Sequence, residues 1–509
     1  MMTLLSRPLL AASLILVLVS TAAGAATHVH ASPQLKTLHG SATQLHGATR
    51  LSAAPSTAPV DVVVSLEPRH ADLLHAYASQ SGTQLSNGQL HSMFAPSAAS
   101  RAAVMRYMRA QGFALRSSGL LSMSFHGSSA AAGRAFHVGM SSYRGANGKH
   151  FRAPDGAIRL PAGIASVVSD VSGLNTALTL QNHTKLAKSV TALAPHGVAT
   201  CAGATNAKSF YGGYLPQDLQ TAYTHGTLIA GGNNGSNQTI ALAEFSSYKS
   251  DDINSFKSCF GLTQPVHNHA VNAGTSSLGG AIEVELDIEV ALSQAPDLDS
   301  VEVYKAPNNI AQFLPMVGQM VSDSNNPTKN PSGNPYIVSD SWGLCEAALT
   351  PSFLSAENTQ LEVAAAAGLS FYVASGDAGS SACAAIDKRF TQLVSDDPSS
   401  QPFATGVGGT NLPHATPAGD SSVWKFGGGG ISMLWPQPAY QSGNPHRSYD
   451  NGSKCGNNPG TGLGFCRQKR ARWLPRRTGS RRPRRGWSRS RRRRRRRRRP
   501  SPPPALCPS

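Results

Sequence analysis

The first third of the chain combines short apolar runs with one helical pattern. Residues 60–66 are rich in valine and bounded by prolines, a pattern that predicts a β-strand. Residues 100–111 repeat apolar side chains at helical spacing, and Gly112 follows them as a residue that can end a helix. Residues 114–125 and 135–143 have the pattern of short strands. Strands mixed with a helix over ~120 residues predict a compact α+β unit.

The region from residue 201 to residue 466 has a different pattern. Short apolar runs alternate there with helix-like stretches. Such runs suit strands that are buried on both faces of a parallel sheet. The alternation therefore predicts a doubly wound α/β domain. The runs are 238–243, 301–304, 336–339 and 369–374.

These patterns divide the chain into six segments. A loose leader and a first domain follow a signal peptide, and a linker separates the first domain from a larger second one. The last segment is a basic, proline-rich tail. The boundaries that we predict are 1–25, 26–57, 58–176, 177–200, 201–466 and 467–509.

The N-terminus has the pattern of a secretory signal. Arg7 precedes an apolar stretch, residues 9–19, that is too short to span a bilayer, and Ala23-Gly24-Ala25 follows as a small-residue cleavage site. A membrane anchor is the alternative interpretation. No later segment has the ~20 consecutive apolar residues that a spanning helix needs. We therefore expect a secreted or periplasmic protein that has no membrane attachment once the signal is removed.

The net charge is distributed unevenly along the chain. The sequence has 45 Lys and Arg against 27 Asp and Glu, a formal charge of +18. The tail holds 20 of these basic residues and no acidic residue, so the first 466 residues carry a net charge of −2. Nine consecutive arginines, 491–499, repel one another and are expected to stay disordered. The rest of the chain gives no reason to expect a nucleic-acid partner.

The seven cysteines all follow residue 200, and none forms a Cys-x-x-Cys pair, which argues against zinc. Export permits disulfide bonds, although spacing alone does not prove their connectivity. His267 and His269 show no wider ligand spacing, so we interpret them as surface residues. We expect Cys507 to be left over from three disulfide bonds: Cys201–Cys259, Cys345–Cys383 and Cys455–Cys466.

An acidic segment at residues 282–290 admits two interpretations. Taken alone it alternates strictly, apolar at even positions and acidic at odd ones, which favours a half-buried strand with four carboxylates on one face. If the segment is a helix instead, Glu283 and Asp287 stand one turn apart on one face. Two carboxyl groups that close would share a proton and could accept a proton from a hydroxyl at acidic pH.

Several loops follow predicted strands. Asp377 lies in a turn between two glycines, where it is either an active group at the carboxyl end of a strand or an ordinary helix cap. The segment 339–343 contains a tryptophan that can anchor a loop. The glycines of 406–410 and 427–430 fit neither a P-loop nor a dinucleotide fingerprint, so we interpret them as close-packing loops at a cleft.

Residues 60 to 466 resemble the sedolisin family in the order of their motifs. Glu283 and Asp287 match the family's Glu-x-x-x-Asp pair, and Asp377 matches its oxyanion aspartate in Ser-Gly-Asp. The second domain also matches at 215–219, 403–410 and 424–441. The first domain resembles the family's activation pro-domain at 94–97, 107–113, 135–138, 160–162 and 171–174.

The resemblance implies a subtilisin-like α/β catalytic domain, an α+β pro-domain that acts as an intramolecular inhibitor, and a monomeric endopeptidase acting on proteins at acidic pH. It moves 282–290 from a strand to a helix that lines the cleft. Glu283 becomes the general base on a nucleophilic serine, and Asp287 shares its proton. Asp377, when protonated, donates to the oxyanion. The family also binds one Ca²⁺ ion near its C-terminus.

The sequence departs from the family after residue 466. We find no Ser-Gly-Thr-Ser-x-x-x-Pro segment for the nucleophile and no C-terminal calcium ligands, and Gly274-Thr275-Ser276 precedes Glu283 instead of following it. A frameshift in a GC-rich gene is our hypothesis, and a basic tail on a non-catalytic homologue is the rival. The 509 residues are thus expected to be an inactive peptidase by descent, a peptide-binding homologue, or a protein whose tail binds anionic polymers in a salt-dependent way.

Overall fold

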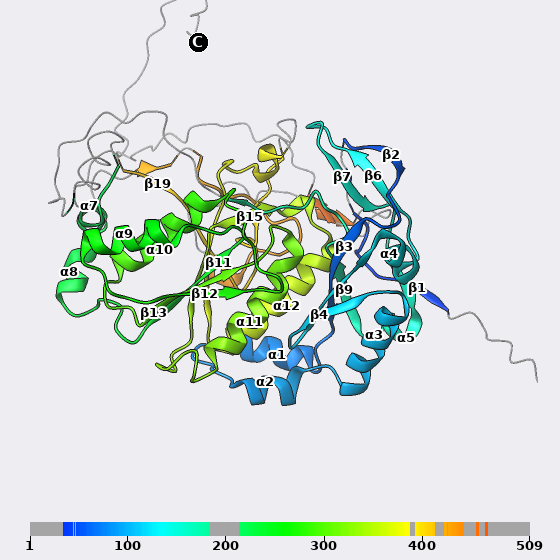
Figure 1. Cartoon of the computed structure of the whole chain (residues 1–509), viewed down its shortest axis with the longest axis horizontal. Helices are drawn as coiled ribbons and strands as arrows, with labels where there is room; N and C mark the ends of the chain where they lie inside the picture. Colours follow the sequence, from blue (N-terminus) through cyan, green and yellow to red (C-terminus); the bar gives the residue numbers. More distant parts are fainter. Residues whose placement is uncertain are drawn as a thin grey trace, which may run out of the picture.

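The computed structural model describes most of the chain from residue 34 to residue 441 (Figure 1). The predicted signal peptide, most of the linker and the arginine-rich tail lie outside the described residues. Among the described residues, no helix is both long enough and apolar enough to cross a membrane. The described ranges are 34–43, 45, 47–182, 201, 213–386, 392–412, 422–424, 426–441, 455–457 and 464–466.

The first domain is built on a four-stranded antiparallel sheet in the order β4-β5-β3-β9. Valines 60, 62 and 64 of its central strand are buried, and Val104 and Met108 of α3 pack into the same core. The predicted strand at 60–66 and helix at 100–111 are confirmed, and Gly112 has a φ of +95° just after the helix. The elements are β3 (Pro59–Leu66), α1 (Ala71–Ala78), α2 (Asn87–Phe94), α3 (Ala98–Ala110), β4 (Ala114–Ser118), β5 (Ser122–Ser128), α4 (Ser129–Phe136), β6 (Met140–Arg144), β7 (His150–Pro154), β8 (Arg159–Pro161), α5 (Ala162–Ala165) and β9 (Val168–Ser172).

Three expectations for this half of the chain are wrong in detail. The expected leader contributes two strands: β1 (Leu35–Thr37) pairs with β8, and β2 (Thr49–Ala53) pairs with β6. Strands of this kind are held by backbone hydrogen bonds to a neighbouring strand and do not require an apolar pattern in their own sequence. The expected strand at 135–143 starts only at Met140, since the alanine-rich segment before it forms α4, capped by Ser128. The expected linker begins with β10 (Gln181–Asn182), which pairs with β15 of the second domain.

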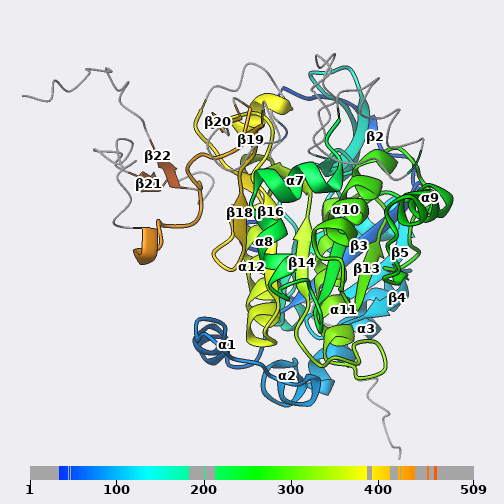
Figure 2. The same cartoon turned by 90° about the vertical axis from the view of Figure 1, so that its left-hand side faces the viewer.

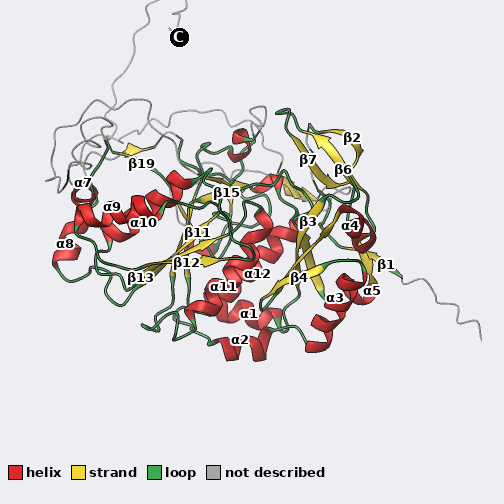
Figure 3. Ribbon diagram, viewed as in Figure 1, coloured by secondary structure: helices red, strands yellow, loops and turns green. Residues whose placement is uncertain are grey.

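The second domain has a six-stranded parallel sheet in the order β12-β13-β11-β14-β16-β18, which confirms the predicted α/β class. Helices α9 and α10 lie on one side of this sheet, and α11 and α12 lie on the other (Figures 1 and 3). The elements are α7 (Pro216–Ala222), α8 (His225–Ala230), β11 (Thr239–Glu244), α9 (Ser250–Phe260), β12 (Val266–Ala270), α10 (Ala281–Gln294), β13 (Ser300–Lys305), α11 (Phe313–Ser324), β14 (Ile337–Asp340), β15 (Trp342–Cys345), α12 (Pro351–Ala366), β16 (Ser370–Ala374), β17 (Asp396–Asp397), β18 (Thr405–Val407), β19 (Thr410–Asn411), β20 (Ser422–Val423), β21 (Cys455–Asn457) and β22 (Gly464–Cys466).

The acidic segment is the helix α10, so the strand that its local alternation favours is wrong. Val284, Ile288 and Leu292 are buried at intervals of four residues, whereas Ile282 and Leu286 are exposed. This spacing places one apolar stripe of the helix on the sheet. The interpretation that follows from the sedolisin resemblance is confirmed.

Two of the three expected disulfide bonds are present. Cys201 bonds to Cys259, and Cys345 bonds to Cys383. For the third, the backbones of Cys455 and Cys466 are paired in the β21–β22 hairpin, but their side chains lie outside the described residues.

The first domain packs on α12 of the second domain (Figure 2). Ser352 Oγ donates to Asp170 Oδ1 of β9 at 2.6 Å, and the N–H of Leu85 donates to the carbonyl of Ala366 at 2.8 Å. His75 Nδ1 of α1 lies 2.8 Å from Glu362 Oε1. Contacts at both ends of α12 therefore hold the two domains together.

Candidate active site

The carboxyl ends of β11, β14 and β16 meet at one edge of the parallel sheet, because parallel strands all point the same way. β11 ends at Glu244 and β14 ends at Asp340, and the turn that carries Asp377 follows β16. The helix α10 approaches the same edge. The sequence elements that were singled out separately are thus brought to one place.

Glu283 and Asp287 lie one turn apart on α10. Glu283 is 3% exposed, and Asp287 is partly buried. Burial, with the neighbouring Asp287 carboxyl and then Asp377, raises the pKa of Glu283 to about 8, although a hydrogen bond with Ser341 opposes the shift. Burial raises the pKa of Asp287 to about 6, against hydrogen bonds with Ser341 and Glu244. The pair therefore retains at least one proton over the whole acidic range.

Glu244 extends this pair into the protein interior. It is fully buried, and Trp342 Nε1 donates to its Oε2 at 2.8 Å. Burial, together with the charge of Asp287, raises the pKa of Glu244 well above its usual value. Glu244 was not predicted from the sequence, although an acidic residue at the end of an apolar strand is a usable signal. The proton that Glu283 and Asp287 share thus has a third carboxyl group within reach.

The junction between β14 and β15 supplies the support for these groups. The N–H of Trp342 donates to Asp340 Oδ1 at 2.9 Å, and Ser341 between them is the hydrogen-bonding partner of Glu283 and Asp287. A Cβ at Gly280 would lie 2.4 Å from the Trp342 ring, so only glycine lets α10 start this close. The predicted anchoring role of the tryptophan is confirmed, and the polar role of Ser341 was not predicted.

The turn that carries Asp377 lies against the same cluster. Gly376 has a φ of +100°, and a Cβ there would lie 2.2 Å from Asp396 Oδ2. The charge of Asp377 acts on Glu283 and on Asp396, and Asp396 has its pKa raised to about 7 by burial and by Asp397 before Asp377. The predicted trio of Glu283, Asp287 and Asp377 is therefore gathered at one site.

The glycine-rich loops pack directly on this turn. A Cβ at Gly428 would lie 1.7 Å from the Ser375 carbonyl oxygen, and Ser375 Oγ donates to the Gly428 carbonyl at 3.2 Å. The interpretation of these glycines as close-packing residues is confirmed for Gly409, Gly428 and Gly430, whereas a Cβ at Gly429 would meet nothing within 4 Å.

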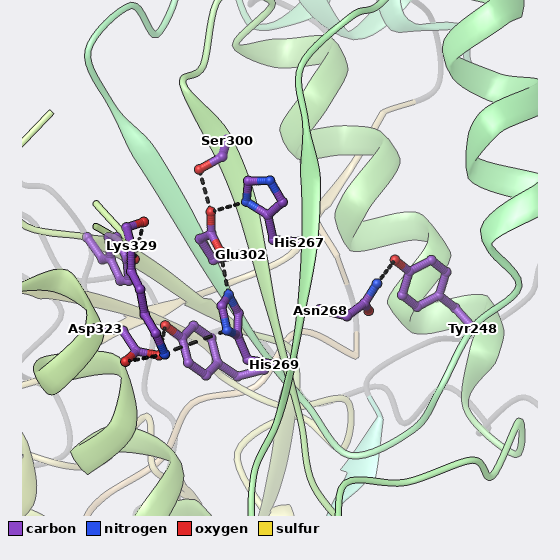
Figure 4. A network of polar contacts seen from close by, with 10 residues as sticks. Tyr248, His267, Asn268, His269, Ser300, Glu302, Asp323 and Lys329 are labelled. Atoms are coloured by element: carbon purple, nitrogen blue, oxygen red, sulfur yellow. Dashed lines mark hydrogen bonds and ion pairs between the residues drawn. The ribbon is translucent and has the colours of Figure 1, made fainter. Parts of the chain in front are cut away.

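A second polar network lies on β12, the outermost strand of the parallel sheet, away from this site (Figure 4). His267 and His269 of β12 both bond to the buried Glu302, at 2.8 and 2.5 Å, and Ser300 donates to it at 2.6 Å. Asp323, bonded to Lys329 and Tyr304, continues the network. Both histidines are thus bound to a carboxyl group, and the prediction of surface residues holds for His267, which is 55% exposed, but not for His269, which is 16% exposed. Among the residues that the structure describes, no cluster of three or more histidine, cysteine or acidic side chains suits a metal ion.

Comparisons with known proteins find similarity over part of the chain. Residues 46–177 match the family described as Pro-kumamolisin, activation domain. Kumamolisin from Bacillus sp. (strain MN-32) is 31% identical over 315 residues, which are 58% of this chain and 52% of kumamolisin. Tripeptidyl-peptidase 1 from Bos taurus is 32% identical over 215 residues, which are 41% of this chain and 37% of that protein. The chain thus spans about half, or less, of the length of these relatives.

A solved structure of Pseudomonas sedolisin, a serine-carboxyl proteinase complexed with two molecules of pseudo-iodotyrostatin, is 23% identical. It covers 45% of this chain and 66% of the sedolisin chain with a TM-score of 0.37. The activation-domain match and the partial similarity to these two relatives support the resemblance to the sedolisin family that the motifs around Glu283 and Asp377 indicate.

Proposed function

We propose that this chain is built as a secreted, monomeric endopeptidase precursor that acts on proteins at acidic pH. Glu283 is the general base for a serine hydroxyl, Asp287 shares its proton, and Asp377 donates a hydrogen bond to the oxyanion. The observation that supports this assignment is the burial of Glu283 and Asp287 side by side, with Asp377 close enough to act on Glu283. Such a pair can carry one negative charge and one proton at the same time.

The roles of these groups set an alkaline limit to the working range. Asp377 must hold a proton to donate to an oxyanion, and the pair must keep one proton for Asp287 to support Glu283. The second proton leaves the pair near the pKa of about 8 at Glu283. We therefore place the alkaline limit of the site near pH 8, because both carboxyl groups are ionised above it.

The first domain acts as the inhibitor of this site in the same proposal. Its match to an activation domain supports this role, and so does its packing along α12. Cleavage in the segment between the two domains would then start activation. The precise bond is left open, because the segment 183–200 lies outside the described residues.

The 509 residues contain no match to the family's nucleophile segment, so we propose that they bind peptides without cleaving them. Calcium binding by the family's C-terminal ligands stays a prediction about the relatives, since those ligands are not found in this sequence. No step of the proposed chemistry passes through a metal ion.

The test has two arms. Resequencing the gene through codons 455–509 in all three frames shows whether a shifted frame encodes the serine segment. If it does, the restored protein should cleave quenched peptides at acidic pH, and Glu283→Gln should lower kcat/KM by roughly a thousandfold or more. Glu289→Gln is the matched control, because Glu289 lies on the same helix with its pKa also raised, to about 7, by burial and two other carboxyl groups. An equal loss in both variants would contradict the assignment of Glu283.

The second arm concerns the 509 residues themselves. Peptide binding without turnover at about pH 4 is the expected result, measured by calorimetry and by mass spectrometry of the peptide. Turnover that survives Glu283→Gln would contradict the proposed base. Binding to nucleic acid that weakens with salt and disappears when residues 467–509 are deleted would instead assign the basic tail an activity of its own.

A further inference from the structure

Glu346 fastens the segment that follows the glycine-rich loop. It lies just after β15 and is 1% exposed. Ser432 Oγ donates to its Oε1 at 2.5 Å, and the N–H of Met433 donates to its Oε2 at 2.6 Å. Ser432 Oγ in turn accepts from the N–H groups of Leu434 and Trp435. One buried carboxyl group therefore organises residues 432–435.

The glycine-rich loop and the Asp377 turn form one packed unit. Besides the contact of Gly428 with Ser375, the N–H of Gly379 donates to the carbonyl of Phe426 at 3.1 Å. A Cβ at Gly428 would lie 1.7 Å from the Ser375 oxygen, so the backbones of the two segments are in direct contact. Displacing residues 426–435 would therefore displace the turn that carries Asp377.

A single hydroxyl group stands between Glu346 and a second buried carboxyl group. Ser400 Oγ lies 3.3 Å from Glu346 Oε1 and 3.4 Å from Asp397 Oδ1. Asp397 is fully buried, accepts from Gln401 Nε2 at 2.8 Å and shares a hydrogen bond with Glu357 of α12. A hydroxyl group has only one hydrogen to donate. If Glu346 is protonated, it can donate to Ser400 while Ser400 donates to Asp397, but two anions would compete for that hydrogen.

The surroundings favour the protonated form of Glu346. Burial raises its pKa to about 7, with the charge of Asp397 adding to this and hydrogen bonds from Ser432, Met433 and Ser400 opposing it. The charged groups that the structure places around the chain Glu346–Ser400–Asp397 are also carboxyl groups, namely Asp340 of β14, Glu357 of α12 and Asp396 of β17. Ionised Glu346 is therefore repelled by the other carboxyl groups around it.

We propose that Glu346 is a positioning residue for the site: protonated, it fastens the glycine-rich loop and so orders the Asp377 turn, and ionised, it releases them. This inference rests on the proposed role of Asp377, but the fastening itself can be measured without any catalysis. Since the folded-state pKa of about 7 lies above the usual 4.5, the stabilisation is complete below about pH 4.5 and is lost as the pH rises through about 7. The loop is thus ordered in the acidic range and loosened above neutrality.

The test is hydrogen exchange of the full chain at pH 5 and pH 8, with rates divided by the intrinsic exchange rate at each pH. In the wild type, protection of peptides covering 375–379 and 426–435 should fall by roughly ten- to a hundredfold at pH 8. Glu346→Gln is neutral at both pH values: its amide oxygen can accept from the N–H of Met433 while its NH2 group donates to Ser432 and Ser400, so its protection should stay high at both pH values. Asp397→Asn removes the competing anion and should also reduce the pH-dependent loss.

Two variants separate Glu346 from other groups that titrate in the same range. Glu289→Gln, on α10, should leave the loosening unchanged, and Asp396→Asn tests the other carboxyl group beneath the turn. The proposal is overturned if the wild type shows no loosening, if Glu346→Gln and Asp397→Asn loosen as the wild type does, or if only Asp396→Asn prevents it. None of these outcomes depends on whether the chain cleaves peptides, so a failure here is distinct from a failure of the proposed function.

Discussion

At the scale of single residues, the site depends on carboxyl groups that were visible in the sequence and on partners that were not. Glu283, Asp287 and Asp377 stand where the motifs put them, whereas Glu244 and Ser341 complete the site from other strands. A carboxyl group in contact with another in a buried place holds a proton that it would lose in water. The environment, and not the residue type, therefore decides which protons the site keeps.

The raised pKa of Glu283 predicts a pH-dependent change in stability. Its stabilising effect is complete below about pH 4.5 and is lost as the pH rises through about 8. Glu283→Gln, which is always neutral, should match the wild type at pH 5 and be more stable by about 3 kcal/mol at pH 9. Urea unfolding at the two pH values measures this. A difference that is the same at both would show that Glu283 does not titrate as a buried group.

At the scale of elements, α10 shows how a local pattern can mislead. Its strict alternation predicts a strand, but the side chains that are buried against the sheet are Val284, Ile288 and Leu292, which are spaced four residues apart as on a helix. A period of two and a period of four both fit Val284 and Ile288, so the local sequence could not decide between them. The resemblance to the sedolisin family decided correctly because it used the order of motifs along the whole chain.

Two substitutions on α10 distinguish the helix from the strand. Ile288→Ala removes a fully buried side chain and should cost about 2–4 kcal/mol of unfolding free energy. Ile282→Ala removes a side chain that is 55% exposed and should cost less than about 0.5 kcal/mol. In a strand the two side chains would share one face and give similar losses. Thermal unfolding of both variants tests this.

The network on β12 predicts acid resistance of the sheet edge (Figure 4). Burial alone would raise the pKa of Glu302, but hydrogen bonds with His269, Ser300 and His267 lower it overall. Its stabilising effect is therefore present above about pH 4.5 and is lost as the pH falls through the lowered value. Glu302→Gln should cost about 2 kcal/mol at pH 7 and less at pH 2. Asn268→Ala, on the same strand, is the control and should change stability little at either pH.

At the scale of the whole molecule, the two domains meet through a buried carboxyl group. Burial raises the pKa of Asp170 to about 6 against its hydrogen bonds with Ser352 and Ser172. Its contribution is complete below about pH 3.8 and is lost as the pH rises through about 6. The contact between the domains through Asp170 is therefore weaker at neutral pH than in acid.

Asp170→Asn should strengthen this contact where the carboxyl group would be ionised. The amide oxygen still accepts from Ser352, so we expect a gain of about 2 kcal/mol at pH 7.5 and no gain at pH 3.5. Unfolding of the first domain, monitored by limited proteolysis, provides the measurement. Asp61→Asn is the control, because Asp61 pairs with His126 on an exposed surface. A gain in the control, or a gain in acid, would contradict the assignment to Asp170.

The sequence by itself determined the α+β and α/β classes, most of the buried strands, the helix predicted at 100–111, two disulfide bonds and the three carboxyl groups that lie together at the candidate site. These features depend on local patterns or on motifs whose order survives along the chain. Only the tertiary structure decided that Glu244, Ser341 and Trp342 join Glu283 and Asp287, and that Ser400 stands between Glu346 and Asp397. The physical reason is that burial and partners set a proton's position, and residues from separate strands become neighbours only when the parallel sheet aligns their ends.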